Sequence, residues 1–285
     1  MLCHLLVYLI IGVLLIHRAG SSREGGFQYS SQQHWSGTCS NNTGHQSPIN
    51  IQVPDNTVKV QDPLLVPAAT KDVTMEMMKD DHTVKVTFPE GIDGEFEFKI
   101  PTTNGVKTKA LQLHLHWGQS EHMINFKWYK LESHLVTLRV DDGQPKLTVF
   151  GRVFELGEAN PMVEKMIEAA ERNATQVEGF DLTVLYPPSI RHILAYSGSL
   201  TTPPCTEGVS WFVVQEPLTI SEDQVARLKN LALGHSAHKL KSNYRFIQKI
   251  NNRTITRYDL TGESGTISVA LSGFCLFVGT ILTLF

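Results

Sequence analysis

Short runs in which apolar and polar residues alternate occupy the middle of the chain. A period of two puts successive side chains on opposite faces of a β-strand, so each run predicts a strand with one packed face. The runs are residues 82–88, 95–100, 111–117, 132–140, 147–154 and 210–214, and Asp142-Gly143 predicts a turn between two of them. The pattern therefore predicts a mainly β protein.

Two segments have a helical period instead. One begins after Asn160, an N-cap residue followed by Pro161 at the first helical position. The other opens with the capping box formed by residues 221–224. The expected buried residues are Val163, Met166, Ile167 and Ala170 in the first helix, and Val225, Leu228 and Leu231 in the second. No repeat or linker divides residues 23–261, which predicts a single α+β domain, mainly β, with helices on its outside.

Composition excludes two broad classes of protein. The chain has 285 residues, of which 41% are hydrophobic, and this is too apolar for a disordered protein. Its 25 basic and 28 acidic residues give a net charge of −3. Because no basic field exists to attract phosphate backbones, we expect no nucleic-acid partner.

Both ends of the chain are apolar and have the character of targeting signals. Residues 5–16 form an uncharged run followed by the small residues Ala19 and Gly20, which predicts a signal peptide over residues 1–20. An uncleaved buried helix is the alternative. The run 267–285 contains no charge and follows small residues, which predicts a GPI attachment signal over residues 262–285. Ser264 is the expected attachment site, with Gly262 and Gly265 close behind, and a tail-anchored span is the alternative.

Cysteines and glycosylation sequons fit a secreted protein. Cys39 and Cys205 remain once the two end segments are removed, and a secreted chain most simply pairs them. Asn-x-Thr sequons occur at Asn41, Asn173 and Asn252. We therefore expect a glycoprotein on the extracellular face of the plasma membrane, held there by a GPI lipid.

Candidate chemistry lies on two of the predicted strands. Alternation places Leu111, Leu113, Leu115 and Trp117 on one face, and Gln112, His114 and His116 on the other. The next strand adds His134, with Glu132 on the same face. Three neutral imidazoles are the ligands of a catalytic zinc site with an open fourth position. Gln112 and Glu132 are expected to accept hydrogen bonds from His114 and His134 and so to fix their tautomers.

A His-x-His pair is common enough to need alternatives. It also occurs in purely structural roles and in other metal sites. A metal-binding cupin is one rival, because His114, His116 and Glu121 satisfy part of the cupin motif. Trp128 stands where that motif requires glycine, and the second glycine-rich half is missing. The spacing therefore disfavours a cupin, and a zinc site remains one interpretation of the three histidines.

Several separated segments resemble the α-class carbonic anhydrases. They are residues 46–50 (QSPIN), 112–118 (QLHLHWG), 120–122 (SEH), 132–136 (ESHLV), 197–205 (SGSLTTPPC), 209–211 (VSW) and 243–245 (NYR). The likeness runs from about residue 29 to residue 258. The cysteine placement and the anchor signal resemble the extracellular, membrane-tethered branch of the family. That branch often has a further disulfide near its N-terminus, which this chain lacks.

The resemblance implies a fold and a reaction. The fold is a large twisted mixed β-sheet with short peripheral helices and a conical zinc cleft, in a catalytic domain over residues 21–261. The reaction is reversible hydration of CO₂ to bicarbonate and a proton, by zinc-hydroxide attack, which would regulate pH or supply bicarbonate transporters. We expect a monomer. A non-catalytic carbonic-anhydrase-like recognition domain is the alternative, although such relatives characteristically lose zinc ligands that are present here.

The resemblance also assigns roles to residues. His114, His116 and His134 correspond to the zinc ligands, and Thr201 to the hydroxyl that accepts a hydrogen bond from zinc-bound hydroxide and donates one to Glu121. His82 corresponds to the proton shuttle. The CO₂ site corresponds to Val136, Val149, Leu200, Thr201, Thr202, Val209 and Trp211. Core packing is the alternative for the five apolar members of that set.

Some features near these residues carry further expectations. Asp80 and Asp81 beside His82 predict a raised pKa for its imidazole, which Lys85 would oppose. The expected disulfide would fix the loop that carries Thr201. Ser47-Pro48 and Pro203-Pro204 are candidates for cis peptide bonds. Ser133 and the pair Thr137-Leu138 depart from the family pattern and predict repacking behind the site.

Overall fold

The computed structural model describes residues 27–40, 44–60, 72–89, 97–99, 107–141, 144–234 and 238–260. The expected signal peptide (1–20), the anchor signal (262–285) with Ser264, the Asn41 sequon and the turn at 142–143 lie outside the described residues. None of the described helices is both long and apolar enough to cross a membrane.

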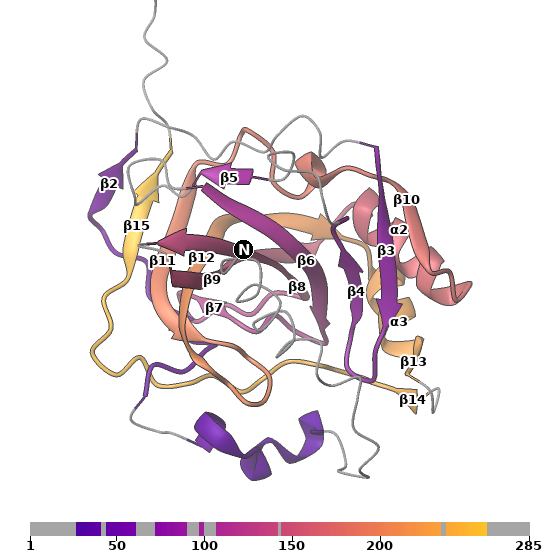
Figure 1. The fold of residues 1–285 in the computed structure, drawn as a ribbon, viewed down its shortest axis with the longest axis horizontal. Helices are drawn as coiled ribbons and strands as arrows, with labels where there is room; N and C mark the ends of the chain where they lie inside the picture. Colours follow the sequence, from indigo (N-terminus) through magenta and orange to yellow (C-terminus); the bar gives the residue numbers. More distant parts are fainter. Residues whose placement is uncertain are drawn as a thin grey trace, which may run out of the picture.

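In the part of the chain that the structure describes, eleven strands form one mixed sheet (Figure 1). In spatial order these are β10 (Gln176–Phe180), β3 (Val73–Lys79), β4 (Val84–Thr87), β6 (Lys107–Trp117), β8 (Leu131–Asp141), β9 (Gln144–Leu156), β12 (Glu207–Ile220), β11 (His192–Ser199), β15 (Thr256–Asp259) and β2 (Thr57–Lys59), with β5 (Glu97–Lys99) on β6. The pairs β9–β12 and β15–β2 are parallel, and the other pairs are antiparallel. The predicted fold class is confirmed.

Shorter elements surround this sheet. They are the 3₁₀ helices η2 (Tyr29–His34), η3 (Gly37–Ser40) and η5 (Leu182–Val184), the parallel pair β1 (Asn50–Ile51) with β7 (Met123–Ile124), and the antiparallel pair β13 (Ala232–Leu233) with β14 (His238–Lys239). The segment containing η2 and η3 runs along one end of the molecule, in indigo in Figure 1.

The hydrophobic core has two parts, and neighbouring residues of one strand belong to different parts. In β8, Leu135 belongs to one buried cluster and Val136 to another. In β12, Phe212 belongs to the first cluster and Trp211 to the second. Because successive side chains of a strand point to opposite faces, the two clusters cover opposite faces of the sheet. The first cluster also contains the buried apolar residues of both helices.

Both predicted helices form and are capped as expected. In α2 (Pro161–Glu171), Asn160 Oδ1 accepts hydrogen bonds from the backbone N–H groups of Met162 and Val163, each at 3.1 Å. In α3 (Glu222–Asn230), Ser221 and Gln224 form the capping box. The chain turns to an extended conformation at Leu231, one residue after the helix ends, and this side chain is still buried.

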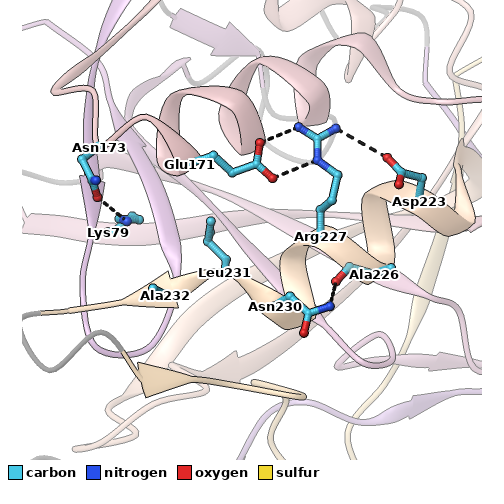
Figure 2. Close-up of a pocket in the computed structure, with 9 residues that line it drawn as sticks. All are labelled: Lys79, Glu171, Asn173, Asp223, Ala226, Arg227, Asn230, Leu231 and Ala232. Atoms are coloured by element: carbon cyan, nitrogen blue, oxygen red, sulfur yellow. Dashed lines mark hydrogen bonds and ion pairs between the residues drawn. The ribbon is translucent and has the colours of Figure 1, made fainter.

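An ion-pair network joins the two helices on the outer surface (Figure 2). The guanidinium of Arg227 on α3 donates to both carboxylate oxygens of Glu171 on α2, at 2.9 and 2.7 Å. The same guanidinium pairs with Glu164 on α2 and with Asp223 one turn earlier on α3. A groove of about 480 Å³ runs beside this network.

One detail of the predicted alternation is wrong. The β6–β8 register shifts between Ala110 and Gln112, so Leu111 forms a bulge. Leu113, Leu115 and Trp117 join the helix-covered cluster, whereas Leu111 packs against the cluster on the opposite face. The bulge lies before the histidines and leaves their alternation intact.

Candidate metal centre and active site

Three histidines from β6 and β8 converge on one point. The sheet register places His114 opposite His134, and His116 opposite Glu132. One ring nitrogen from each of the three histidines lies within 4.8 Å of those of the other two. The i, i+2 spacing on β6 and the antiparallel neighbour together produce this geometry.

Hydrogen bonds orient the two rings on β6. His114 Nδ1 donates to Gln112 Oε1 at 2.9 Å, as the sequence analysis expects. His116 Nδ1 donates to the backbone carbonyl of Asn243 at 2.7 Å. With Nδ1 bonded in both rings, Nε2 is the nitrogen left to face a metal.

His134 is the end of a buried chain of hydrogen bonds. Its Nε2 donates to Glu132 Oε1 at 2.9 Å, which leaves Nδ1 to face the metal. Glu132 Oε1 also accepts from His122 Nδ1 at 2.7 Å, and His122 Nε2 accepts from the hydroxyl of Tyr196 at 2.6 Å. Tyr196 in turn contacts Ser47 Oγ at 2.8 Å. This series of hydrogen bonds through Glu132, His122, Tyr196 and Ser47 fixes the orientation of the His134 ring.

The charges in this region favour neutral imidazoles. Burial, and then the neighbouring His116 and His134 rings, lowers the pKa of His114 well below 6.5. Burial also lowers the pKa of His116, although Glu121 opposes the shift. Burial alone would raise the pKa of Glu132, but the imidazoles of His122 and His134 lower it well below 4.5. These shifts favour uncharged imidazoles at His114 and His116 and an ionised carboxylate at Glu132.

An orphaned nitrogen indicates that the residues fit a metal. His116 is 1% exposed, and its Nε2 has no hydrogen-bond partner among the described residues. A buried polar atom without a partner is costly, and a bound cation would satisfy it. Three imidazole nitrogens are the donor set of a catalytic zinc site. The residues present therefore fit zinc.

A family model for eukaryotic-type carbonic anhydrase matches residues 30–259, which include every residue of this centre. The chain belongs to the carbonic anhydrase family. The family and the mixed sheet exclude the cupin alternative.

Individual relatives agree with the family match. The chain is 32% identical over 282 residues to putative carbonic anhydrase 5 of Caenorhabditis elegans, covering 88% of each protein. It is 31% identical over 252 residues to a carbonic anhydrase of Dunaliella salina, covering 80% of this chain but 42% of that longer protein. The solved structure of carbonic anhydrase Cah3 from Chlamydomonas reinhardtii in complex with acetazolamide superposes with a TM-score of 0.65 at 27% identity, covering 84% of this chain and 99% of that one.

Glu121 lies beside the converging histidines in this carbonic anhydrase. Its Oε1 accepts from the backbone N–H of Arg245 at 2.7 Å. Its Oε2 lies 3.5 Å from His116 Nε2 and 3.8 Å from His134 Nδ1, and has no hydrogen-bond partner in the described part of the chain. The hydrogen bond from Thr201 to Glu121 is therefore not formed here, and the relay that the resemblance implies stays a prediction.

A disulfide and several hydrogen bonds hold the loop that carries Thr201 in place. Cys205 forms the expected disulfide with Cys39. Its backbone carbonyl accepts from Thr38 Oγ1 at 2.7 Å and from Gln46 Nε2 at 3.1 Å. Thr201 itself is buried, and Thr202 is half-buried. Both candidate X-Pro bonds, Ser47-Pro48 and Pro203-Pro204, are cis.

The expected apolar wall lies in the buried cluster on the metal side of the sheet. Val136, Val149, Val209 and Trp211 are members of that cluster, and Leu200 packs against it. The Trp211 ring lies 4.8 Å from the His134 ring, centroid to centroid. This places an apolar surface beside one ligand, while the conical cleft and the CO₂ site stay predictions.

His82 lies in a turn before β4 and is covered by aromatic rings. Its ring stacks on Phe27 at 3.8 Å between centroids and contacts Tyr29 edge-on at 6.2 Å. The expectation of a raised pKa is wrong: burial lowers the pKa of His82 below 6.5. Asp80 and Asp81 do oppose the shift, but they do not outweigh the loss of solvation.

Two of the three sequons fall on described residues, and both are exposed. Asn173 follows α2 and borders the groove of Figure 2, where its Oδ1 accepts from Lys79 Nζ at 2.6 Å. Asn252 is exposed near the end of the domain.

Sequence reasoning missed two residues that support the centre. Asn243 accepts the bond from His116 and also accepts from the backbone N–H of Trp117 through its side chain at 2.5 Å. Tyr196 extends the chain behind His134. Asn243 stands in one of the segments that resemble the family, but nothing local to it indicates contact with a strand more than a hundred residues earlier.

Proposed function

We propose that this carbonic anhydrase catalyses reversible hydration of CO₂ to bicarbonate and a proton at a zinc ion held by His114, His116 and His134. The observation that carries the proposal is the convergence of three imidazoles, one of which has a buried nitrogen without a partner. When bound, zinc acts as a Lewis acid that lowers the pKa of water to about 7, a value established for carbonic anhydrases in general.

The chain's own residues supply orientation and a dry surface. Gln112, Asn243 and Glu132 hold the three rings by their outer nitrogens, so the donors are in place before a metal arrives. The mainly apolar cluster around Trp211 provides an apolar environment beside His134, which suits an apolar substrate.

Thr201 and Glu121 would give the reacting oxygen its direction. A threonine hydroxyl has one proton to donate. If it donates to the unpartnered Glu121 Oε2, the Thr201 oxygen can only accept from the attacking hydroxyl group. That group then turns a lone pair toward the substrate, which is the orientation that attack requires. The buried, hydrogen-bonded setting of Glu121 supports this role.

Metal content and hydration rate, measured on one purified sample, test the proposal. We expect about one zinc per chain, CO₂ hydration that a sulfonamide such as acetazolamide inhibits, and loss of activity on chelation with recovery when zinc is restored. A folded protein that binds zinc but hydrates no CO₂ would instead support the non-catalytic recognition domain.

We also propose that the enzyme acts at the extracellular face of the plasma membrane. In this scheme residues 1–20 are removed, residues 21–261 form the catalytic domain and Ser264 carries a GPI lipid. The Cys39–Cys205 disulfide supports an oxidising compartment. The exposed sequons at Asn173 and Asn252 are compatible with N-glycans. A monomer placed there could supply bicarbonate transporters.

Treatment of intact cells with a phosphatidylinositol-specific phospholipase tests the anchor. A GPI-linked enzyme should appear in the medium, with its hydration activity, after treatment. A Ser264→Leu variant with Gly262 and Gly265 also replaced is the control and should yield no released enzyme. Retention of the unmodified protein on the membrane would favour a tail-anchored span.

A further inference from the structure

A second imidazole shares a cavity with His82. The cavity has a volume of about 680 Å³, and its wall includes His82, Asp81 and His238. His238 begins β14 and is half-buried. None of the three histidines of the metal centre is among the described residues that line this cavity.

We propose that His238 is a second station for the proton, which it receives from His82 and passes to solvent. This inference rests on the proposed hydration activity, in which His82 takes a proton from the metal centre. The step moves one proton only: the imidazolium of His82 becomes neutral and the imidazole of His238 becomes the cation. His238 then returns to its neutral form by releasing that proton to a buffer base.

The surroundings of His82 restrict where its proton can go. Phe27 stacks on one face of the ring, and Tyr29 contacts it edge-on, so the ring is packed rather than free in solvent. The backbone N–H of His82 donates to Asp80 Oδ1 at 2.8 Å, which ties down the turn. His82 also lines the cavity that it shares with His238.

The charged groups around the cavity and the burial of His82 together favour release of the proton from His82 over its retention there. Asp80 and Asp81 attract a proton to His82, whereas burial and the charge of His238 repel one. Lys85 pairs with Asp80 at 3.7 Å, and Lys241 lines the same cavity. A cation on His238 disfavours a cation on His82, so the two imidazoles that line this cavity are electrostatically coupled.

Four variants test the relay through the dependence of hydration on buffer concentration. His238→Gln should lower the rate several-fold in weak buffer and leave it unchanged in concentrated buffer, where buffer bases take protons directly from His82. His238→Arg should behave like His238→Gln, because a guanidinium keeps the charge but cannot pass a proton near neutrality. His82→Ala should lower the weak-buffer rate by about tenfold or more. The double variant should be no slower than His82→Ala, since stations in series do not act independently.

A second readout does not depend on activity. Nuclear magnetic resonance should show a raised His82 pKa in His238→Gln and no such rise in His238→Arg. Exposed His45 is the matched control, and His45→Gln should change neither the rates nor the His82 titration. Circular dichroism and the unfolding midpoint verify that each variant is folded.

Specific results would overturn the relay. A His238→Gln enzyme with the parent's weak-buffer rate, or a His238→Arg enzyme that retains the parent's rate, excludes His238 as a proton station. A double variant whose losses multiply shows that His238 acts apart from His82. If the parent enzyme hydrates no CO₂, the proposed function is wrong. The His82 titration then still decides whether the two imidazoles are coupled.

Discussion

His116→Ala should bind no zinc at stoichiometric metal and should hydrate CO₂ no faster than the uncatalysed reaction. The substitution removes the buried nitrogen that has no hydrogen-bond partner among the residues that the structure describes, and it leaves two ligands, too few for a catalytic zinc site. The affinity for zinc should fall by more than the factor of about 10 to 100 that loss of a group hydrogen-bonded to a ligand costs. Zinc per chain and stopped-flow hydration rates measure both effects.

Glu132→Gln is the comparison variant for His116→Ala, and its zinc affinity should fall by a smaller factor. The glutamate accepts from His134 and His122 through Oε1, and from the His122 backbone N–H through Oε2. The glutamine side chain has one oxygen that can still accept a hydrogen bond. Its NH₂ group would face an N–H donor at the place where the second carboxylate oxygen of Glu132 accepts. All three ligands remain, so zinc affinity should fall by about 10- to 100-fold and added zinc should restore activity. Stoichiometric zinc and a full rate in folded His116→Ala would contradict the assignment of the centre.

The convergence of the three histidines could be predicted because it is a local property of two strands. Alternation alone puts His114 and His116 on one side of β6, and a neighbouring strand supplies His134. The same pattern could not show the bulge at Leu111, since a bulge depends on the partner strand as much as on its own sequence. Capping residues likewise predicted both helices, because their signals lie within the first helical turn.

Strands without alternation escaped the sequence analysis. In β11 the run from Ile193 to Tyr196 is apolar and buried on both faces, so no period of two marks it. The edge strands β2 and β10, and β15 beside β2, are short and mostly exposed or half-buried, which leaves little pattern to detect. Their places in the sheet follow from pairing with distant strands.

Contacts across long sequence distances explain what the sequence could not show in the site. The His82 environment was misjudged because its neighbours in the chain are acidic, while the group that buries it, Phe27, lies in a distant segment. The bond from His116 to Asn243 joins positions 127 residues apart. Desolvation and hydrogen bonds of this kind exist only once the chain is folded.

Replacing both Cys39 and Cys205 with serine should lower the free energy of unfolding by about 2–5 kcal/mol. The bridge joins residues 166 apart, and closing so long a loop restricts the unfolded chain strongly, in the chain-entropy account. Replacing both cysteines leaves no free thiol to pair elsewhere. Urea unfolding measures the change in the free energy of unfolding, provided that both proteins have the same m value, the slope of that free energy against urea concentration.

The same double variant should also hydrate CO₂ more slowly, because the bridge holds the loop that carries Thr201. Thr38→Val is the matched control: it removes the hydrogen bonds from Thr38 Oγ1 to the carbonyls of Pro204 and Cys205, at 2.6 and 2.7 Å, but keeps the bridge. It should cost about 1 kcal/mol and little activity. A disulfide-free protein that folds and retains the full rate would show that Gln46, Thr38 and packing hold the loop without the bridge. The disulfide would then act on stability alone.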